Sequence, residues 1–209
     1  MIVEEKQNPL GIEKIGTLLR KMAIPAIIAN VVNALYNIVD QIFIGQGVGY
    51  LGNAATNIAF PITTICMAIG LMVGIGAASN FNLALGRKED KHAREVAGTA
   101  VLLLVTAGLM IMSVVLLFLQ PLLNLFGATD QILGYASEYA GITAFGIPFF
   151  MISIGFNPLV RADGRATYSM MAIIVGALLN TVLDPLFIFG FNMGIAGAAW
   201  ATVISQIVS

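Results

Sequence analysis

Six runs of apolar residues, separated by short charged, proline-containing or glycine-rich breaks, make up almost the whole chain after a polar first segment. All but the last are long enough for an α-helix to cross a lipid bilayer, which takes about 20 residues. The pattern predicts a polar segment at residues 1–14, followed by helices at residues 15–45, 54–85, 96–119, 132–160, 168–189 and 194–209. We therefore expect an all-α integral membrane protein with one six-helix transmembrane bundle at residues 15–209.

The sixth apolar run is the shortest. It has 16 residues, 194–209, which is fewer than the roughly 20 that a spanning helix requires. The sixth helix is therefore predicted to be incomplete at the C-terminus of this sequence. We expect the chain to be a fragment of a longer protein.

Composition supports the membrane prediction, and the positions of the basic residues predict an orientation. The chain is 58% hydrophobic and 10% charged, whereas soluble domains carry roughly 25% charged residues. Lys and Arg residues lie before or at the start of the first predicted helix and in the second and fourth loops. Because Lys and Arg in short loops mark the cytoplasmic side, the N-terminal segment is predicted to be cytoplasmic. The lipid bilayer is the expected partner, and no nucleic acid is expected.

Two aspartates, Asp40 and Asp184, lie within apolar runs. A carboxylate at the centre of a membrane helix costs about 2.5 to 3.5 kcal/mol even on lenient insertion scales. Both lie near the same end of their helices, at depths of about 7 to 9 Å for a rise of 1.5 Å per residue. Tyr139 and Thr202 lie at about 12 Å on the same scale. Because intramembrane carboxylates commonly serve ions or protons, this common depth predicts an ion-handling site.

Helical periodicity places polar residues in stripes. Asn33, Asn37 and Asp40 fall on one face of the first predicted helix, and Asn180 and Asp184 are stacked one turn apart on the fifth. A stripe facing lipid would leave amides and carboxylates without partners, so we expect these faces to line the bundle interior or a water-filled cavity. The alternative is a structural role, in which such side chains hold helices together through hydrogen bonds.

The polar cluster offers two ways to neutralise its carboxylates. Pro185 has no N–H, so it frees the carbonyl of Thr181 beside Asp184. Oxygen atoms of this kind bind small hard cations such as Na⁺. Two nearby carboxylates in a low dielectric could instead hold a proton. The predicted cation- or proton-coupling residues are Asp40, Asn180, Asp184 and Thr202. The sequence leaves Na⁺ and H⁺ open, and it predicts no other metal and no cofactor.

Pro25 lies well inside the first predicted helix. Proline kinks helices because it lacks a hydrogen-bond donor. We therefore consider Pro25 a candidate hinge that lets the first helix bend when the charge at Asp40 changes. A fixed kink without a functional role is the alternative.

Three segments together resemble the multidrug and toxic compound extrusion (MATE) family. The stretch from Ile24-Pro25-Ala26 through Tyr36-Asn37-Ile38-Val39-Asp40 resembles the first helix of the family. The run Pro158-Leu159-Val160-Arg161-Ala162-Asp163-Gly164 resembles its fourth cytoplasmic-side turn. Residues 180–184 with 194–202 resemble its fifth and sixth helices. The pattern is most similar to the DinF-like prokaryotic branch.

The resemblance implies the N-terminal lobe of a twelve-helix antiporter in a prokaryotic cell membrane. Such a protein exports cationic or amphipathic compounds against entry of H⁺ or Na⁺. The implied partner is a C-terminal lobe, in the same full-length chain or in another half. Asp40, Asp184, Asn180 and Thr202 resemble the coupling site of the family. The supporting polar network would comprise Tyr36, Asn33, Asn37, Tyr139 and Asn157, although Asn157 falls near the inner end of its predicted helix.

Other functions fit the residues less well. A flippase for lipid-linked saccharides of the same superfamily would need a cationic cavity, and no Lys or Arg lies within a helix core. An intramembrane aspartyl protease usually has a Gly-x-Gly-Asp context, whereas Asp184 follows Asn-Thr-Val-Leu. A non-transporting half-length membrane subunit remains as a further alternative. We expect a transporter and not an enzyme.

Overall fold

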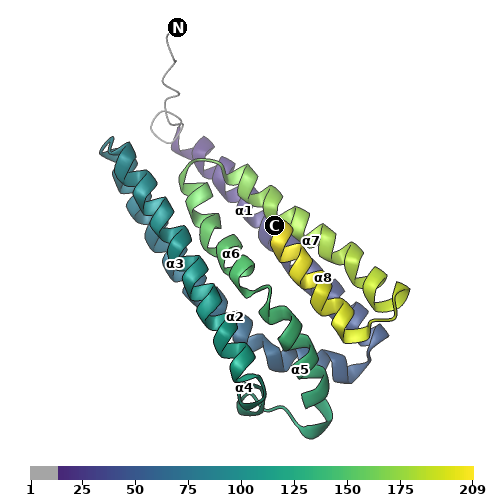
Figure 1. Cartoon of the computed structure of the whole chain (residues 1–209). Helices are drawn as coiled ribbons and strands as arrows, with labels where there is room; N and C mark the ends of the chain where they lie inside the picture. The colour runs from purple at the N-terminus through teal and green to yellow at the C-terminus, as the bar shows by residue number, and fades with distance from the viewer. Residues whose placement is uncertain (1–13) are drawn as a thin grey trace.

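The computed structural model describes residues 14–209, and these residues fold into helices joined by short turns (Figure 1). The predicted cytoplasmic segment 1–14 lies outside the described residues except for Lys14. The helices are α1 (Ile15–Gly47), α2 (Tyr50–Gly86), α3 (Asp90–Leu117), α4 (Leu119–Leu125), α5 (Asp130–Ala144), α6 (Ile147–Ala162), α7 (Ala166–Pro185), the π-helix η2 (Leu186–Gly190) and α8 (Gly194–Val208).

The all-helical membrane fold predicted from the sequence is confirmed. Within residues 14–209, four segments are long and apolar enough to cross a bilayer, namely α1, α2, α3 and α7 with η2. The bent pair α5 and α6 makes a fifth candidate span, and α8 is a shorter apolar helix. Large hydrophobic side chains such as Leu102, Met110 and Leu117 are exposed along these helices. An apolar exterior of this extent suits a lipid environment.

The fourth predicted helix differs from the prediction. The sequence pattern predicts one helix over residues 132–160, but the chain bends by 59° between α5 and α6. Pro148 lies in the first turn of α6, where its missing N–H leaves the carbonyl of Ala144 without a helical donor. Gly146 occupies the bend, and a β-carbon there would collide with the side chain of Gln206. The short helix α4 was also not predicted.

The helices form two groups, visible in Figure 1. One group consists of α1, α7 and α8, with α1 packed mainly against α7. In the other group α6 packs against α2 and α3, and α5 packs against both α2 and α8. The turn between α1 and α2 marks one end of the bundle, which we call the Gly47 end. The turn at Arg87 between α2 and α3 marks the other, the Arg87 end.

Candidate functional site: a buried carboxylate pair

Asp40 on α1 and Asp184 on α7 meet near the Gly47 end of the bundle. Asp40 is 8% exposed and Asp184 is fully buried. Their carboxyl groups lie within hydrogen-bonding reach of each other. The extensive packing between α1 and α7 is what brings together two residues so distant in the sequence. The two costly charges found in the sequence therefore occupy a single site.

Three oxygen atoms of this site have no hydrogen-bond donor among the residues that the structure describes. They are Oδ1 of Asp40, Oδ2 of Asp184 and Oδ1 of Asn180. The amide nitrogen of Asn180 lies 3.4 Å from the other oxygen of Asp184. A buried acceptor without a donor is costly, and two adjacent carboxylates repel each other. A proton or a small cation placed among these atoms would relieve both costs.

Two tyrosines and a threonine lie around the carboxylate pair. Tyr36 precedes Asp40 by about one turn of α1 and lies near both carboxyl groups. Tyr139 from α5 lies near both as well, and its hydroxyl is within hydrogen-bonding reach of Thr202. The hydroxyl of Thr202 on α8 is 3.0 Å from the carbonyl oxygen of Ala198. Four helices, α1, α5, α7 and α8, thus supply the polar groups of the site.

The backbone changes character directly after Asp184. Helix α7 ends at Pro185, and the following residues form the π-helix η2. Because Pro185 lacks an N–H, the carbonyl of Thr181 has no helical donor. Short π-helical segments within α-helices often occur at functional sites. This carbonyl belongs to a residue three positions before Asp184 on the same helix.

Gln41 and Thr56 belong to the same network, although the sequence reasoning missed them. The amide nitrogen of Gln41 lies 3.5 Å from Oδ2 of Asp40 and 3.2 Å from the hydroxyl oxygen of Thr56. The position of Gln41 directly after Asp40 was an available signal. Thr56 could not be found from periodicity, because its approach depends on how α2 folds back after the turn at Gly49.

The asparagine stripe of α1 is not buried within this lobe. Asn30, Asn33 and Asn37 are exposed, whereas Asp40 on the same face is buried. The amide nitrogen of Asn37 donates to the carbonyl of Asn33 at 2.7 Å, so its bond stays within α1. The lobe therefore brings Asp40 to the carboxylate pair and leaves the asparagines on an open face.

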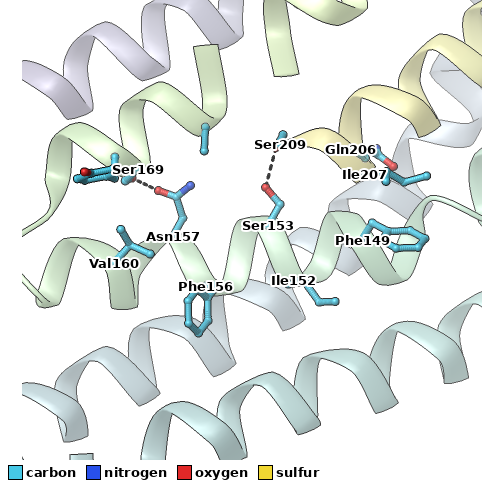
Figure 2. Close-up of a pocket in the computed structure, with 12 residues that line it drawn as sticks. Phe149, Ile152, Ser153, Phe156, Asn157, Val160, Ser169, Gln206, Ile207 and Ser209 are labelled. Carbon is cyan, nitrogen blue, oxygen red and sulfur yellow. Dashed lines mark hydrogen bonds between the residues drawn. The ribbon is translucent and has the colours of Figure 1, made fainter. Parts of the chain in front are cut away.

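Asn157 lies apart from the carboxylate pair. Its Oδ1 accepts hydrogen bonds from the hydroxyl of Ser169 and from Nη2 of Arg161, the latter at 3.1 Å. Ser169 precedes Asp184 by roughly 22 Å along α7 at 1.5 Å per residue. Asn157 and Ser169 line a pocket of about 400 Å³, shown in Figure 2. The hydroxyl groups of Ser153 and Ser209 meet in the same pocket at 2.9 Å.

Pro25 lies inside α1, which continues from Ile15 to Gly47 without a break. In the part of the chain that the structure describes, no three His, Cys, Asp or Glu residues form a group that could hold a metal ion. The oxygen atoms of the carboxylate pair and its neighbours are therefore the candidate ligands for a cation. Small hard cations prefer oxygen ligands of this kind.

A helical lobe with an apolar exterior, several spanning helices and a carboxylate pair buried inside it defines a multi-pass membrane protein. Comparison with known proteins shows the family to which it belongs. The chain belongs to the MatE family, whose model matches residues 25–186. That range includes Asp40, Asn180 and Asp184.

Similar proteins are bacterial exporters and solved transporter structures. The multidrug export protein MepA of Staphylococcus aureus (strain NCTC 8325 / PS 47) is 27% identical over 187 residues, covering 90% of this chain and 42% of MepA. A crystal structure of MATE in complex with MaD3S superimposes with a TM-score of 0.90 at 30% identity, covering 97% of this chain and 46% of that one. An outward-facing multidrug resistance MATE family transporter of the MOP superfamily gives a TM-score of 0.89 at 30% identity, with 97% and 45% covered.

The chain spans less than half the length of the relatives it matches. It corresponds to the N-terminal half of these transporters, and their C-terminal lobe lies outside the sequence. The family consists of membrane transporters and not of enzymes.

Proposed function

We propose that this lobe is the ion-coupling half of a multidrug or metabolite exporter, in which Asp40 and Asp184 bind the H⁺ or Na⁺ that drives efflux. The observation that carries the proposal is the buried carboxylate pair with unpartnered oxygens on Asp40, Asp184 and Asn180. The relatives are described as multidrug export proteins, which supports export of cationic or amphipathic compounds. We further propose a DinF-like prokaryotic branch and a cytoplasmic N-terminus, which puts the site in the outer part of the membrane.

Neutralisation of the pair is the step that would couple the ion to movement. With both carboxyl groups charged, their repulsion disfavours close packing of α1 against α7. A proton or Na⁺ removes that repulsion and supplies the donor or cation that the free oxygens lack. A ligand shifts a conformational equilibrium only by its difference in affinity for the two states. A site built between two helices binds the ion with different affinity in the two states, because separation of the helices changes the positions of the oxygen atoms around the ion.

The two candidate ions would use the same residues differently. A proton needs one carboxyl group to donate to the other, which their mutual reach allows. A sodium ion needs several oxygens, which Asn180 Oδ1, the Thr181 carbonyl and the Thr202 hydroxyl could add to the carboxylates. Measuring efflux under a proton gradient without Na⁺, and under a Na⁺ gradient at constant pH, decides between them.

The exposed asparagines of α1 suit a water-filled cavity between this lobe and a C-terminal lobe. Transporters built from repeated halves bind substrates near the interface between the halves. Asn33 and Asn37 would then face that cavity, while Asp40 faces α7 within the lobe. This arrangement would place the coupling site directly behind one wall of the substrate cavity.

The test uses the full-length transporter in everted membrane vesicles, with ethidium as the transported probe. Asp40→Asn and Asp184→Asn are each expected to abolish gradient-driven efflux while leaving the amount of folded protein unchanged. Glu138→Gln is the matched control, because it removes an exposed carboxylate beside Tyr139 on α5. Normal efflux by both aspartate variants would overturn the proposal.

A further inference from the structure

Gln41 connects the carboxylate pair to a second part of the lobe. Consecutive side chains leave a helix roughly 100° apart, so Asp40 faces α7 while Gln41 turns toward α2. The amide nitrogen of Gln41 lies 3.5 Å from Oδ2 of Asp40 and 3.2 Å from the hydroxyl oxygen of Thr56. One neutral side chain therefore contacts both the charged site and α2.

Thr56 determines how the amide of Gln41 is used. The hydroxyl oxygen of Thr56 is 2.9 Å from the carbonyl oxygen of Asn53 and 3.3 Å from Oε1 of Gln41. The hydroxyl of Thr56 has one proton, and it donates this proton in the shorter contact, to the carbonyl of Asn53. The hydroxyl oxygen of Thr56 then accepts a hydrogen bond from one N–H of Gln41. The second N–H of Gln41 is then available to Asp40, and its Oε1 remains open.

The same residue lines a groove of about 550 Å³ on the α1–α2 side of the lobe. Amide groups dominate its polar surface, and none of its lining residues is charged. The lining residues are Asn37, Ile38, Gln41, Ile42, Gly45, Gln46 and Asn53. Oδ1 of Asn53 is buried and accepts no hydrogen bond from any residue between 14 and 209. Asn53 therefore adds a buried acceptor without a partner to the wall of the groove that Gln41 also lines.

We propose that Gln41 is a positioning residue that transmits the charge state of Asp40 to this amide-lined groove. The inference rests on the proposed coupling role of Asp40. While Asp40 is charged, its carboxylate holds one N–H of Gln41 in a long hydrogen bond of 3.5 Å, because a charged carboxylate is a better acceptor than a neutral carboxyl group. When the coupling ion neutralises Asp40, that bond weakens and the amide turns into the groove. There it meets a hydrogen-bonding group of the transported compound.

The distance between Gln41 and Asp40 suits an exchangeable contact. At 3.5 Å, Nε2 and Oδ2 are at the outer limit of a hydrogen bond, so this bond is easily exchanged for another. The titratable groups that face Asp40 are Tyr36 on α1, Tyr139 on α5 and Asp184 on α7. Helices α2 and α8 contain no acidic or basic residue. The connection from Asp40 to α2 therefore runs through the neutral side chains of Gln41 and Thr56.

A double-mutant cycle on the full-length transporter tests this connection. Gln46→Cys places a thiol in the groove of a protein whose other cysteines, including buried Cys66, are replaced by alanine. Its reaction rate with a water-soluble maleimide reports the state of the groove. Asp40→Asn imitates the neutralised site, and Gln41→Met removes both hydrogen bonds at similar size. The matched control is Asn37→Leu, which removes an amide of the same groove that bonds α1 and not Asp40.

With Gln41 present, Asp40→Asn is expected to change the labelling rate about fivefold, the factor that one hydrogen bond of ordinary net strength represents. In the Gln41→Met background the same change should be less than about twofold, whereas Asn37→Leu should preserve the full response. An equal response in the Gln41→Met background, or no response with Gln41 present, overturns the inference. If Gln41→Met does not fold, Gln41→Leu takes its place in the cycle.

Efflux of ethidium by the same proteins separates this inference from the proposed function. Gradient-driven efflux that survives Asp40→Asn overturns the coupling role itself. Loss of efflux in Asp40→Asn, together with a labelling response that Gln41→Met does not alter, overturns only the role of Gln41. A purely structural role of Gln41 would lower the yield of folded protein without removing the response to Asp40→Asn.

Discussion

Replacement of Gly74 by alanine is expected to force α2 away from α6 and to destabilise the lobe. A β-carbon at Gly74 would lie 2.8 Å from the carbonyl carbon of Gly155 and 2.9 Å from its Cα, and closer still to its carbonyl oxygen. Real β-carbons essentially never approach other atoms this closely. The obstacle is backbone, so no side-chain rotation can relieve it.

The size of the effect follows from how tightly this crossing is held. Gly155 is itself closely packed between Leu104 of α3 and the carbonyl oxygen of Gly70, so α6 cannot simply move away. Overpacking of this kind costs about 1 to 3 kcal/mol, and a backbone obstacle favours the upper half of that range. Alanine in place of glycine within a helix returns about 1 kcal/mol. The expected net loss is about 1 to 2 kcal/mol, or a Tm lower by about 2 to 8 °C.

Gly76→Ala on the same helix is the matched control. A β-carbon there would meet nothing within 4 Å, so only the helix-propensity gain of about 0.5 to 1 kcal/mol applies. Thermal unfolding of the purified full-length protein in detergent, followed by circular dichroism, compares the two variants. Equal stability of Gly74→Ala and Gly76→Ala would show that α2 and α6 do not cross as closely at Gly74 and Gly155 as the structure indicates.

Two further variants test the predicted roles of Asn157 and Pro25. Asn157→Leu removes the acceptor for Ser169 and Arg161, so we expect a Tm lower by a few degrees. The ion concentration for half-maximal efflux should not change. A shift in that concentration would contradict the separation of Asn157 from the carboxylate pair. Pro25→Ala restores an N–H to α1. If Pro25 is a hinge, this variant should show slower efflux, while ion binding measured by calorimetric titration stays unchanged. Normal efflux would exclude the hinge.

Hydrophobic patterning predicted the helices well, because each span is a long apolar run bounded by charged or glycine-rich turns. It did not predict the 59° bend between α5 and α6. Both halves of that span are apolar, so their pattern reads as one helix. Pro148 lies within this run, yet proline alone does not separate a mild kink from a break. Gln206 of α8 also packs closely at Gly146 in the bend, a contact that periodicity does not contain.

The candidate site was predictable in part because charge inside an apolar run is a strong local signal. Depth arithmetic placed Asp40, Asp184, Tyr139 and Thr202 at one level, and the structure brings these residues together. The contact of Gln41 with Thr56 was not predictable, since neutral amides and hydroxyls are common in membrane helices. The asparagines of α1 were expected to line the bundle interior or a cavity, yet they are exposed on this lobe. Helical periodicity shows that residues share one face of a helix, but it does not show which part of the protein that face contacts.

The placement of the carboxylate pair gives it direct influence over α1. In the most apolar window of α1 only 6% of the residues are buried within the lobe, against 22% to 28% for the other three candidate spans. Helix α1 is therefore held mainly by its packing on α7, the interface that contains Asp40 and Asp184. A change of charge there would act directly on the contact that fixes α1. In the proposed cycle, ion binding would therefore move α1 more readily than it would move the helices of the second group.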